Sequence, residues 1–101
     1  DDIVSLQRFS GSINLNATAI GLGLEDVTYE PEVFAGLEYN PAAHDATVFV
    51  FMSGVVFAVG DTEDSTVGAL RYFFNALASL GLDDEASFGP DIQTGQVSEF
   101  L

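Results

Sequence analysis

The chain has 101 residues, 48% of them hydrophobic, so its length suits one domain with one apolar core. It carries 16 Asp and Glu against two Arg and no Lys, for a formal net charge of −14. The apolar content excludes a disordered acidic tail, and the absence of cysteine excludes disulfides, thiolate metal sites and cysteine nucleophiles.

The excess of carboxylates predicts strong self-repulsion at ordinary ionic strength. In molar salt the Debye length falls to about 3 Å, and most of that repulsion disappears. The charge therefore favours a protein of a salt-rich cytoplasm; an acidic protein from an ordinary cell is the alternative. No stretch approaches the roughly 18 apolar residues of a membrane span and no signal peptide is visible, so we expect a cytoplasmic protein without membrane contact.

The first quarter of the chain predicts an extended segment followed by a poor helix. Residues 3–15 read as the extended segment, because polar and small or apolar residues alternate there. Residues 16–24 predict a short helix that Gly21 and Gly23 weaken.

A turn and a short strand come next. Residues 29–32 predict the turn, since Pro31 fixes its own φ and disfavours helical backbone at the residue before it. Residues 34–39 predict a short strand, and residues 40–45 a second loop.

Residues 47–60 predict a β-hairpin that turns around Ser53 and Gly54. Alternate residues of a strand point to opposite faces, and here both faces are apolar. A sheet with one wet face would instead alternate apolar and polar residues. One face carries Phe49, Phe51, Phe57 and Val59, and the other carries Val48, Val50, Met52, Val56 and Ala58.

Residues 61–80 predict one long helix that starts at an acidic, capping segment and ends at Gly81. Its apolar residues recur at three- and four-residue spacing. Residues 83–101 predict an acidic or polar tail, or one added strand. The fold class is therefore α+β, an antiparallel sheet with a long helix across one face.

One helix covers only one face of the hairpin. The other face needs a second copy of the chain, a partner protein or an apolar ligand surface, because large exposed apolar patches mark such sites. The alternative is that the C-terminal tail folds over this face.

Three segments, in this order, resemble a repeat of the TATA-binding protein family. Residues 29–39 look like the loop, called the stirrup, and the strand of that family's second repeat; residues 49–60 are similar to its hairpin, and residues 6–12 to its opening strand. The long helix at 61–81 falls where the family has its convex helix. The resemblance covers about residues 3–82 and implies a TATA-binding-protein-like curved sheet, with both helices on the convex face. We accordingly divide the chain into a single repeat at 1–82 and the tail at 83–101.

In that family two repeats form a saddle whose concave sheet binds a widened minor groove of DNA. With one repeat here, the resemblance implies a homodimeric saddle on A/T-rich promoter DNA. Two phenylalanines fall on the family's wedge positions, which unstack base steps. The DNA-binding residues implied are Phe34, Phe49, Phe51, Phe57, Val59, Arg8 and Ser10.

The match departs from the family where polar contacts are made. Arg8 and Ser10 replace an asparagine and a valine, and Val59 replaces a threonine. Asn40 and Val55 stand where the family has basic residues that touch phosphates, and phosphate contacts usually supply much of DNA affinity.

The stirrup residues Glu30, Glu32 and Val33 match the place where the family's second repeat meets transcription factor B. The alternative function is therefore a protein-interaction module or regulator that binds such a basal factor without reading DNA. An acidic turn in an acidic protein is the structural alternative for these three residues.

Nothing in the chain supplies an enzyme's active site. His44 is the only histidine and lies in a predicted loop, and there is no Lys or Cys, so triads and phosphate-binding loops have no components. We expect neither catalysis, nor a cofactor, nor a specific metal site.

Overall fold

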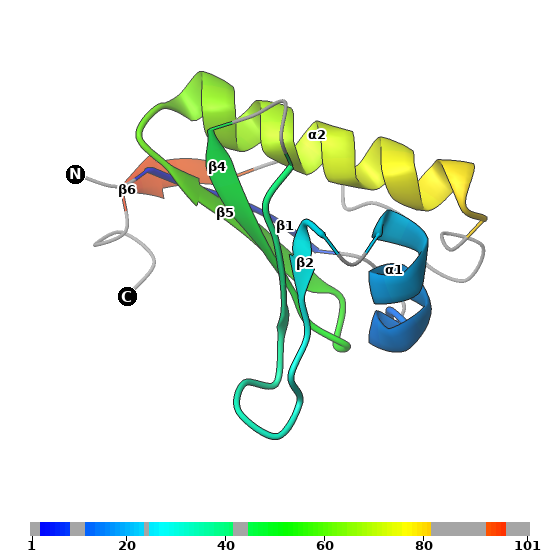
Figure 1. Ribbon diagram of the computed structural model, residues 1–101. Helices are drawn as coiled ribbons and strands as arrows, with labels where there is room; N and C mark the ends of the chain where they lie inside the picture. Colours follow the sequence, from blue (N-terminus) through cyan, green and yellow to red (C-terminus); the bar gives the residue numbers. More distant parts are fainter. Residues whose placement is uncertain (1–2, 9–11, 24, 42–44, 82–92, 97–101) are drawn as a thin grey trace.

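The computed structural model describes residues 3–8, 12–23, 25–41, 45–81 and 93–96. These residues form one antiparallel sheet with helices on one side (Figure 1). The strand order across the sheet is β2-β3-β4-β5-β1-β6. In chain order the elements are β1 (Ile3–Arg8), α1 (Leu15–Leu22), β2 (Val27–Thr28), β3 (Leu37–Tyr39), β4 (Ala46–Val50), β5 (Val55–Gly60), α2 (Glu63–Ser79) and β6 (Gln93–Gln96).

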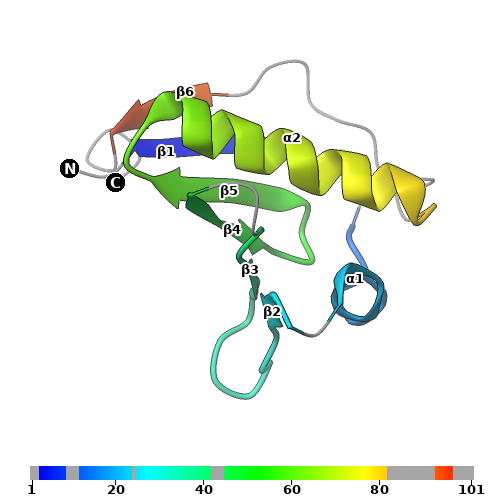
Figure 2. The ribbon, with the colours of Figure 1, turned by 45° about the horizontal axis from the view of Figure 1, so that its top comes forward.

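The long helix α2 lies across one face of the curved sheet, as the sequence predicts (Figure 2). Thr62 caps its start by accepting a hydrogen bond from the Ser65 N–H at 3.1 Å, and Gly81 follows its end with a positive φ of 71°. α1 contributes to the same core through Leu15 and Ala19. The other members with no exposed surface are Leu37, Val48, Val50, Val56, Ala58, Ala69, Leu70, Phe73 and Leu77. Within the described ranges, neither helix has the length and hydropathy that crossing a membrane requires.

β4 and β5 form the predicted hairpin, in which Phe49 lies opposite Phe57. The Phe51 N–H donates to the Val55 carbonyl at 2.9 Å, which closes a loop of three residues ending in Gly54. Gly54 has a φ of 99°, a conformation that a side chain disfavours. Met52 therefore lies in the loop and is 67% exposed, and the prediction that it belongs to the apolar strand face is wrong.

The first predicted strand does not continue to residue 15, because an asparagine cap starts a helix there. β1 ends at Arg8, and α1 already begins at Leu15. The Asn14 side chain accepts from the Ala17 N–H at 3.1 Å, which favours a helix start at this position.

The strand predicted at residues 34–39 includes only Leu37–Tyr39. The Glu30 carbonyl accepts from both the Val33 and the Phe34 N–H groups, each at 2.9 Å, so the turn at Pro31 extends through Phe34. The two-residue strand β2, which pairs with β3, was not predicted. Two residues are too few for an alternating pattern to reveal.

Part of the predicted tail is an edge strand. β6 pairs antiparallel with β1, and the Thr94 Oγ1 lies 2.9 Å from the Ser5 Oγ. The Ser5 Oγ also shares a 2.7 Å hydrogen bond with the Thr66 Oγ1 of α2, and both Ser5 and Thr66 are fully buried. This hydroxyl chain joins the helix, the first strand and the last. Residues 82–92 and 97–101 lie outside the described residues, and the domain boundary at residue 82 stays a prediction.

Tyr39 is a buried titratable group at the helix side of the sheet. Its ring stacks on Tyr72 of α2, with centroids 6.4 Å apart, and 96% of its surface is removed from solvent. Burial, and then the neighbouring Tyr72 and Asp26, raise the pKa of Tyr39 to about 12. The neutral phenol is therefore the form that the fold favours.

We expect stability to fall in alkaline solution because of Tyr39. The pKa of Tyr39 is higher in the folded state than the unfolded value of about 10, so the neutral phenol stabilises the fold. This contribution to the free energy of unfolding is complete below pH 10 and is lost as the pH rises toward 12. Tyr39→Phe should flatten this decline relative to the unmutated chain, measured as melting temperature between pH 8 and about 12 in molar KCl. An unchanged alkaline slope in Tyr39→Phe would contradict the assignment.

Candidate nucleic-acid interface

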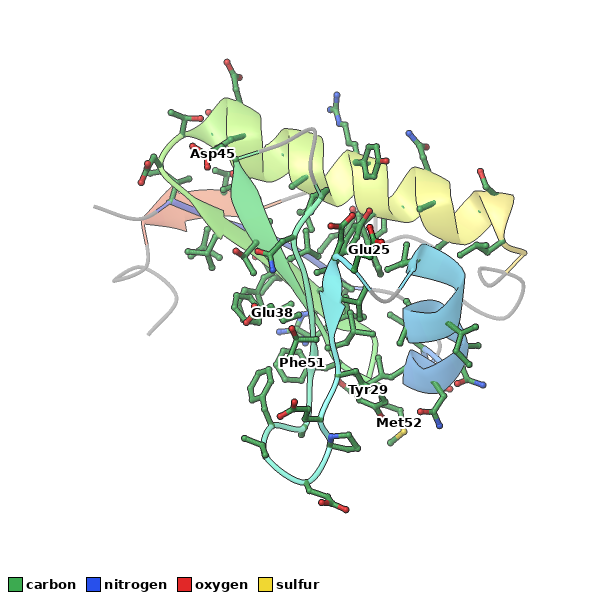
Figure 3. The ribbon with its side chains drawn as sticks, in the orientation of Figure 1. Glu25, Tyr29, Glu38, Asp45, Phe51 and Met52 are labelled. Carbon is green, nitrogen blue, oxygen red and sulfur yellow. The ribbon has the colours of Figure 1, made fainter. Side chains whose placement is uncertain are left out.

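The face of the sheet opposite α2 has its own apolar cluster. Ser5 points to the helix layer, so the alternation of β1 directs Leu6 and Arg8 to the opposite face. Leu6 lies opposite Phe57 of β5, and Phe57 lies opposite Phe49 of β4. Figure 3 shows Phe51 and Glu38 on this side, away from α2.

Four phenylalanine rings meet on this face, and we call them the phenylalanine cluster: Phe34, Phe49, Phe51 and Phe57. The Phe57 ring stacks with Phe49 at 5.1 Å and with Phe51 at 5.9 Å between centroids. Phe34 meets Phe49 and Phe51 edge-on at 6.2 and 5.7 Å. The structure thus brings together four of the predicted DNA-binding residues, from two strands, a turn and a loop.

Phe34 is the outermost ring of the cluster and is 44% exposed. It reaches the cluster because the turn at Pro31 folds the chain back toward β4. Phe49, Phe51 and Phe57 are half-buried. The rings therefore present their remaining surface to whatever approaches this face.

Gly36 makes room for the two outer rings. A Cβ atom at this position would lie 2.8 Å from the Phe51 Cε1 and 2.9 Å from the Phe34 Cε2. Such contacts are closer than carbon atoms tolerate, so a side chain here would force the rings apart. Gly36 was not predicted as a site residue, because its role follows only from the positions of the two rings.

The charged groups on this face are few and of opposite sign. Arg8 is exposed at the end of β1, opposite Val55, and Val59 is half-buried near the other end of β5. Glu38 of β3 lies opposite Phe49 and accepts a 3.3 Å hydrogen bond from the Asn40 Nδ2. Leu6 and Glu38 were not predicted as site residues; alternation from Phe49 through the pairing register identifies both. Ser10 lies outside the described residues.

The stirrup residues Glu30, Glu32 and Val33 are all exposed, and Val33 is 80% exposed. A hollow of about 300 Å³ is lined by residues of this loop and of the phenylalanine cluster. Its lining includes Thr28, Val33, Phe34 and Phe49. The hollow is an apolar recess whose lining also includes the carboxylates of Glu30 and Glu38.

The described residues hold no group of three His, Asp or Glu side chains placed to bind a metal ion. His44 lies outside the described residues. The phenylalanine face and the stirrup offer apolar contact, the guanidinium of Arg8 and scattered carboxylates.

Comparisons with known proteins identify the family of the chain. A sequence model described as "Transcription factor TFIID (or TATA-binding protein, TBP)" matches residues 1–80. The chain belongs to the TATA-binding protein family. That family consists of transcription factors and not of enzymes.

The relatives are archaeal, and several are haloarchaeal. TATA-box-binding protein B of Halobacterium salinarum is 45% identical over 84 residues, which cover 82% of this chain and 45% of the relative. TATA-box-binding protein 3 of Methanosarcina acetivorans is 43% identical over 82 residues, covering 80% of this chain and 44% of the relative. The solved structure of Methanococcus jannaschii TBP matches with a TM-score of 0.72 at 22% identity, covering 94% of this chain and 51% of that one. The chain spans about half the length of the relatives it matches.

We expect Gly36→Ala to disturb the phenylalanine cluster and little else. The added methyl group must push the Phe34 and Phe51 rings apart, which should lower the free energy of unfolding by about 1–3 kcal/mol. The ring-current-shifted proton resonances of these two rings should move in the NMR spectrum. Ala35→Ser, a change at the exposed neighbour, is the matched control; equal stability and unchanged ring resonances in Gly36→Ala would contradict the packing described.

Proposed function

We propose that two copies of this chain form a saddle that binds A/T-rich promoter DNA through the minor groove. The observation that carries the proposal is the phenylalanine cluster on the face that α2 leaves free. Aromatic rings on such a face suit insertion between base steps, which bends the duplex and exposes more apolar groove surface to contact. Membership of the TATA-binding protein family supports the same assignment.

The charge of the chain decides the conditions for binding. At a net charge of −14 the protein and the DNA backbone repel each other in dilute salt. Glu38 on the phenylalanine face adds to this repulsion, and Arg8 is the one cation there among the described residues. Molar KCl screens the repulsion and strengthens apolar contact, so the affinity should rise with salt rather than fall.

The test is fluorescence anisotropy of a labelled A/T-rich duplex titrated with the protein, from dilute to molar KCl. The unmutated chain should bind more tightly as KCl increases. Phe51→Ala should weaken binding about tenfold or more in molar KCl, because loss of one stacked ring costs about 1–3 kcal/mol. Ile20→Ala is the control, since Ile20 is exposed on α1 and not part of the phenylalanine cluster.

Two results would overturn the DNA proposal. The first is no binding at any KCl concentration by a chain whose circular dichroism shows it to be folded. The second is equal affinity for Phe51→Ala and the unmutated chain, since the rings would then not contact the duplex.

The stirrup supports a second candidate function, the binding of a transcription factor B-like protein. Val33 is a large apolar side chain with little protein contact, and it borders the 300 Å³ hollow. Exposed Glu30 and Glu32 flank it, so a partner with an apolar side chain and basic neighbours would fit. A regulator could use this surface without touching DNA.

Calorimetric titration with purified archaeal transcription factor B in molar KCl tests the second function. Val33→Ser should weaken binding about tenfold, since the anchor loses its apolar surface. Met52→Ser serves as control, because Met52 is an exposed apolar residue on a different loop. Binding that is lost in Phe51→Ala but kept in Val33→Ser would place the partner on the phenylalanine cluster instead and reject the stirrup.

A further inference from the structure

The two ends of the sheet differ in what they offer another strand. At one end β2 has two residues and continues into the loop at 29–36. At the other end β6 has four residues and pairs with β1 along one side. No strand among the described residues pairs with the other side of β6.

The outward side of β6 carries hydrogen-bonding groups that can be assigned from the pairing. The Phe51 N–H donates to Val55, and the bonds of an antiparallel pair alternate along each strand. The same alternation can be followed from strand to strand through the paired residues of β4, β5, β1 and β6. It directs the peptide N–H and C=O groups of Ser5 toward β5. It directs those of Thr94 and Gln96 away from β1. These two residues therefore offer donors and acceptors at the edge.

The described edge is short, and it lacks three other features that usually keep sheets apart. Proteins protect edge strands with charged side chains, prolines or bulges. β6 contains no charged residue and no proline, and its four-residue register with β1 is unbroken. β1 beside it carries one charge, on Arg8, in a chain with 16 acidic residues. Two copies can therefore approach by this edge without bringing carboxylates of either strand together.

We propose that the β6 strands of two copies pair antiparallel about a twofold axis, so that two six-stranded sheets become one continuous sheet. This inference rests on the proposed homodimer and names its interface. An axis perpendicular to the sheet leaves both α2 helices on one face and both phenylalanine clusters on the other, as a saddle requires.

The register of the pairing follows from the outward groups. Within β6, only the peptide groups of Thr94 and Gln96 point away from β1. Each Thr94 therefore exchanges backbone hydrogen bonds with Gln96 of the second copy. Gly95 then lies on the axis, opposite its own counterpart, as a pair without mutual hydrogen bonds. The Cα atoms of such a pair are about 4.5 Å apart, within the range that a disulfide spans.

The chain has no cysteine, so one introduced cysteine reports this geometry without background. Gly95 is not among the positive-φ glycines, so a cysteine fits its backbone. Gly95→Cys, oxidised in molar KCl without DNA, should form a disulfide-linked dimer in most of the protein. Gln93→Cys is the matched control: its counterpart would lie four residues away along the strands, about 14 Å, too far for a disulfide.

Sedimentation equilibrium of variants at Thr94 supplies a second measurement. Thr94→Pro removes the outward N–H without removing a bond to β1, and should raise the dimer dissociation constant about tenfold or more, since two bonds are lost per dimer. Thr94→Val keeps this N–H and loses only the hydroxyl contact with Ser5, so its dissociation constant should stay close to that of the unmutated chain.

Outcomes without DNA separate this inference from the DNA proposal. A dimer that Gly95→Cys does not cross-link and Thr94→Pro does not weaken overturns the β6 interface and leaves a homodimer in place. A monomer at every salt and protein concentration overturns both the interface and the homodimer. Neither result depends on whether the anisotropy titration detects DNA binding.

Discussion

The apolar stripe of α2 packs on one face of the sheet, against the β4–β5 hairpin and β1. Leu70, Phe73 and Leu77 have no exposed surface, and neither do Val48, Val50 and Val56 of the facing strands. One helix cannot also cover the reverse side of the same strands, where every second residue of the hairpin is again large and apolar. The sequence of the hairpin therefore produces a second apolar face, on which the phenylalanine rings pack together.

The acidic surface and the apolar face depend on each other. A chain that lacks lysine cannot hold DNA by many phosphate contacts, so an affinity built on ring insertion suits its composition. The same carboxylates keep copies of the chain apart in dilute salt and lose that effect when salt is high. For the proposed dimer and its proposed DNA complex, salt concentration therefore governs both the approach of two copies and the approach of the protein to a duplex.

The long elements could be predicted from the sequence, and the short or irregular ones could not. The periodicity of α2 and the turn signal at Gly54 fix the hairpin and its helix, since both are local patterns. β2 is too short to show an alternating pattern. β3 is shorter than predicted because the Glu30 carbonyl accepts hydrogen bonds from both the Val33 and the Phe34 N–H groups. Among site residues, the cluster phenylalanines follow from alternation and resemblance. Gly36 and Glu38 do not, because their importance arises only from what lies across the sheet.

The hydroxyl chain of Ser5, Thr66 and Thr94 also has a consequence for how the molecule is made. Ser5 is separated from its two partners by 61 and 89 residues, and among the described strands β1 pairs with β5 and β6. Such distant contacts are slow to form, because the intervening chain must close a large loop first. During synthesis, β1 has no partner strand among the described residues until residues 55–60 emerge. That interval, rather than the finished fold, is when the chain is most exposed to mispairing.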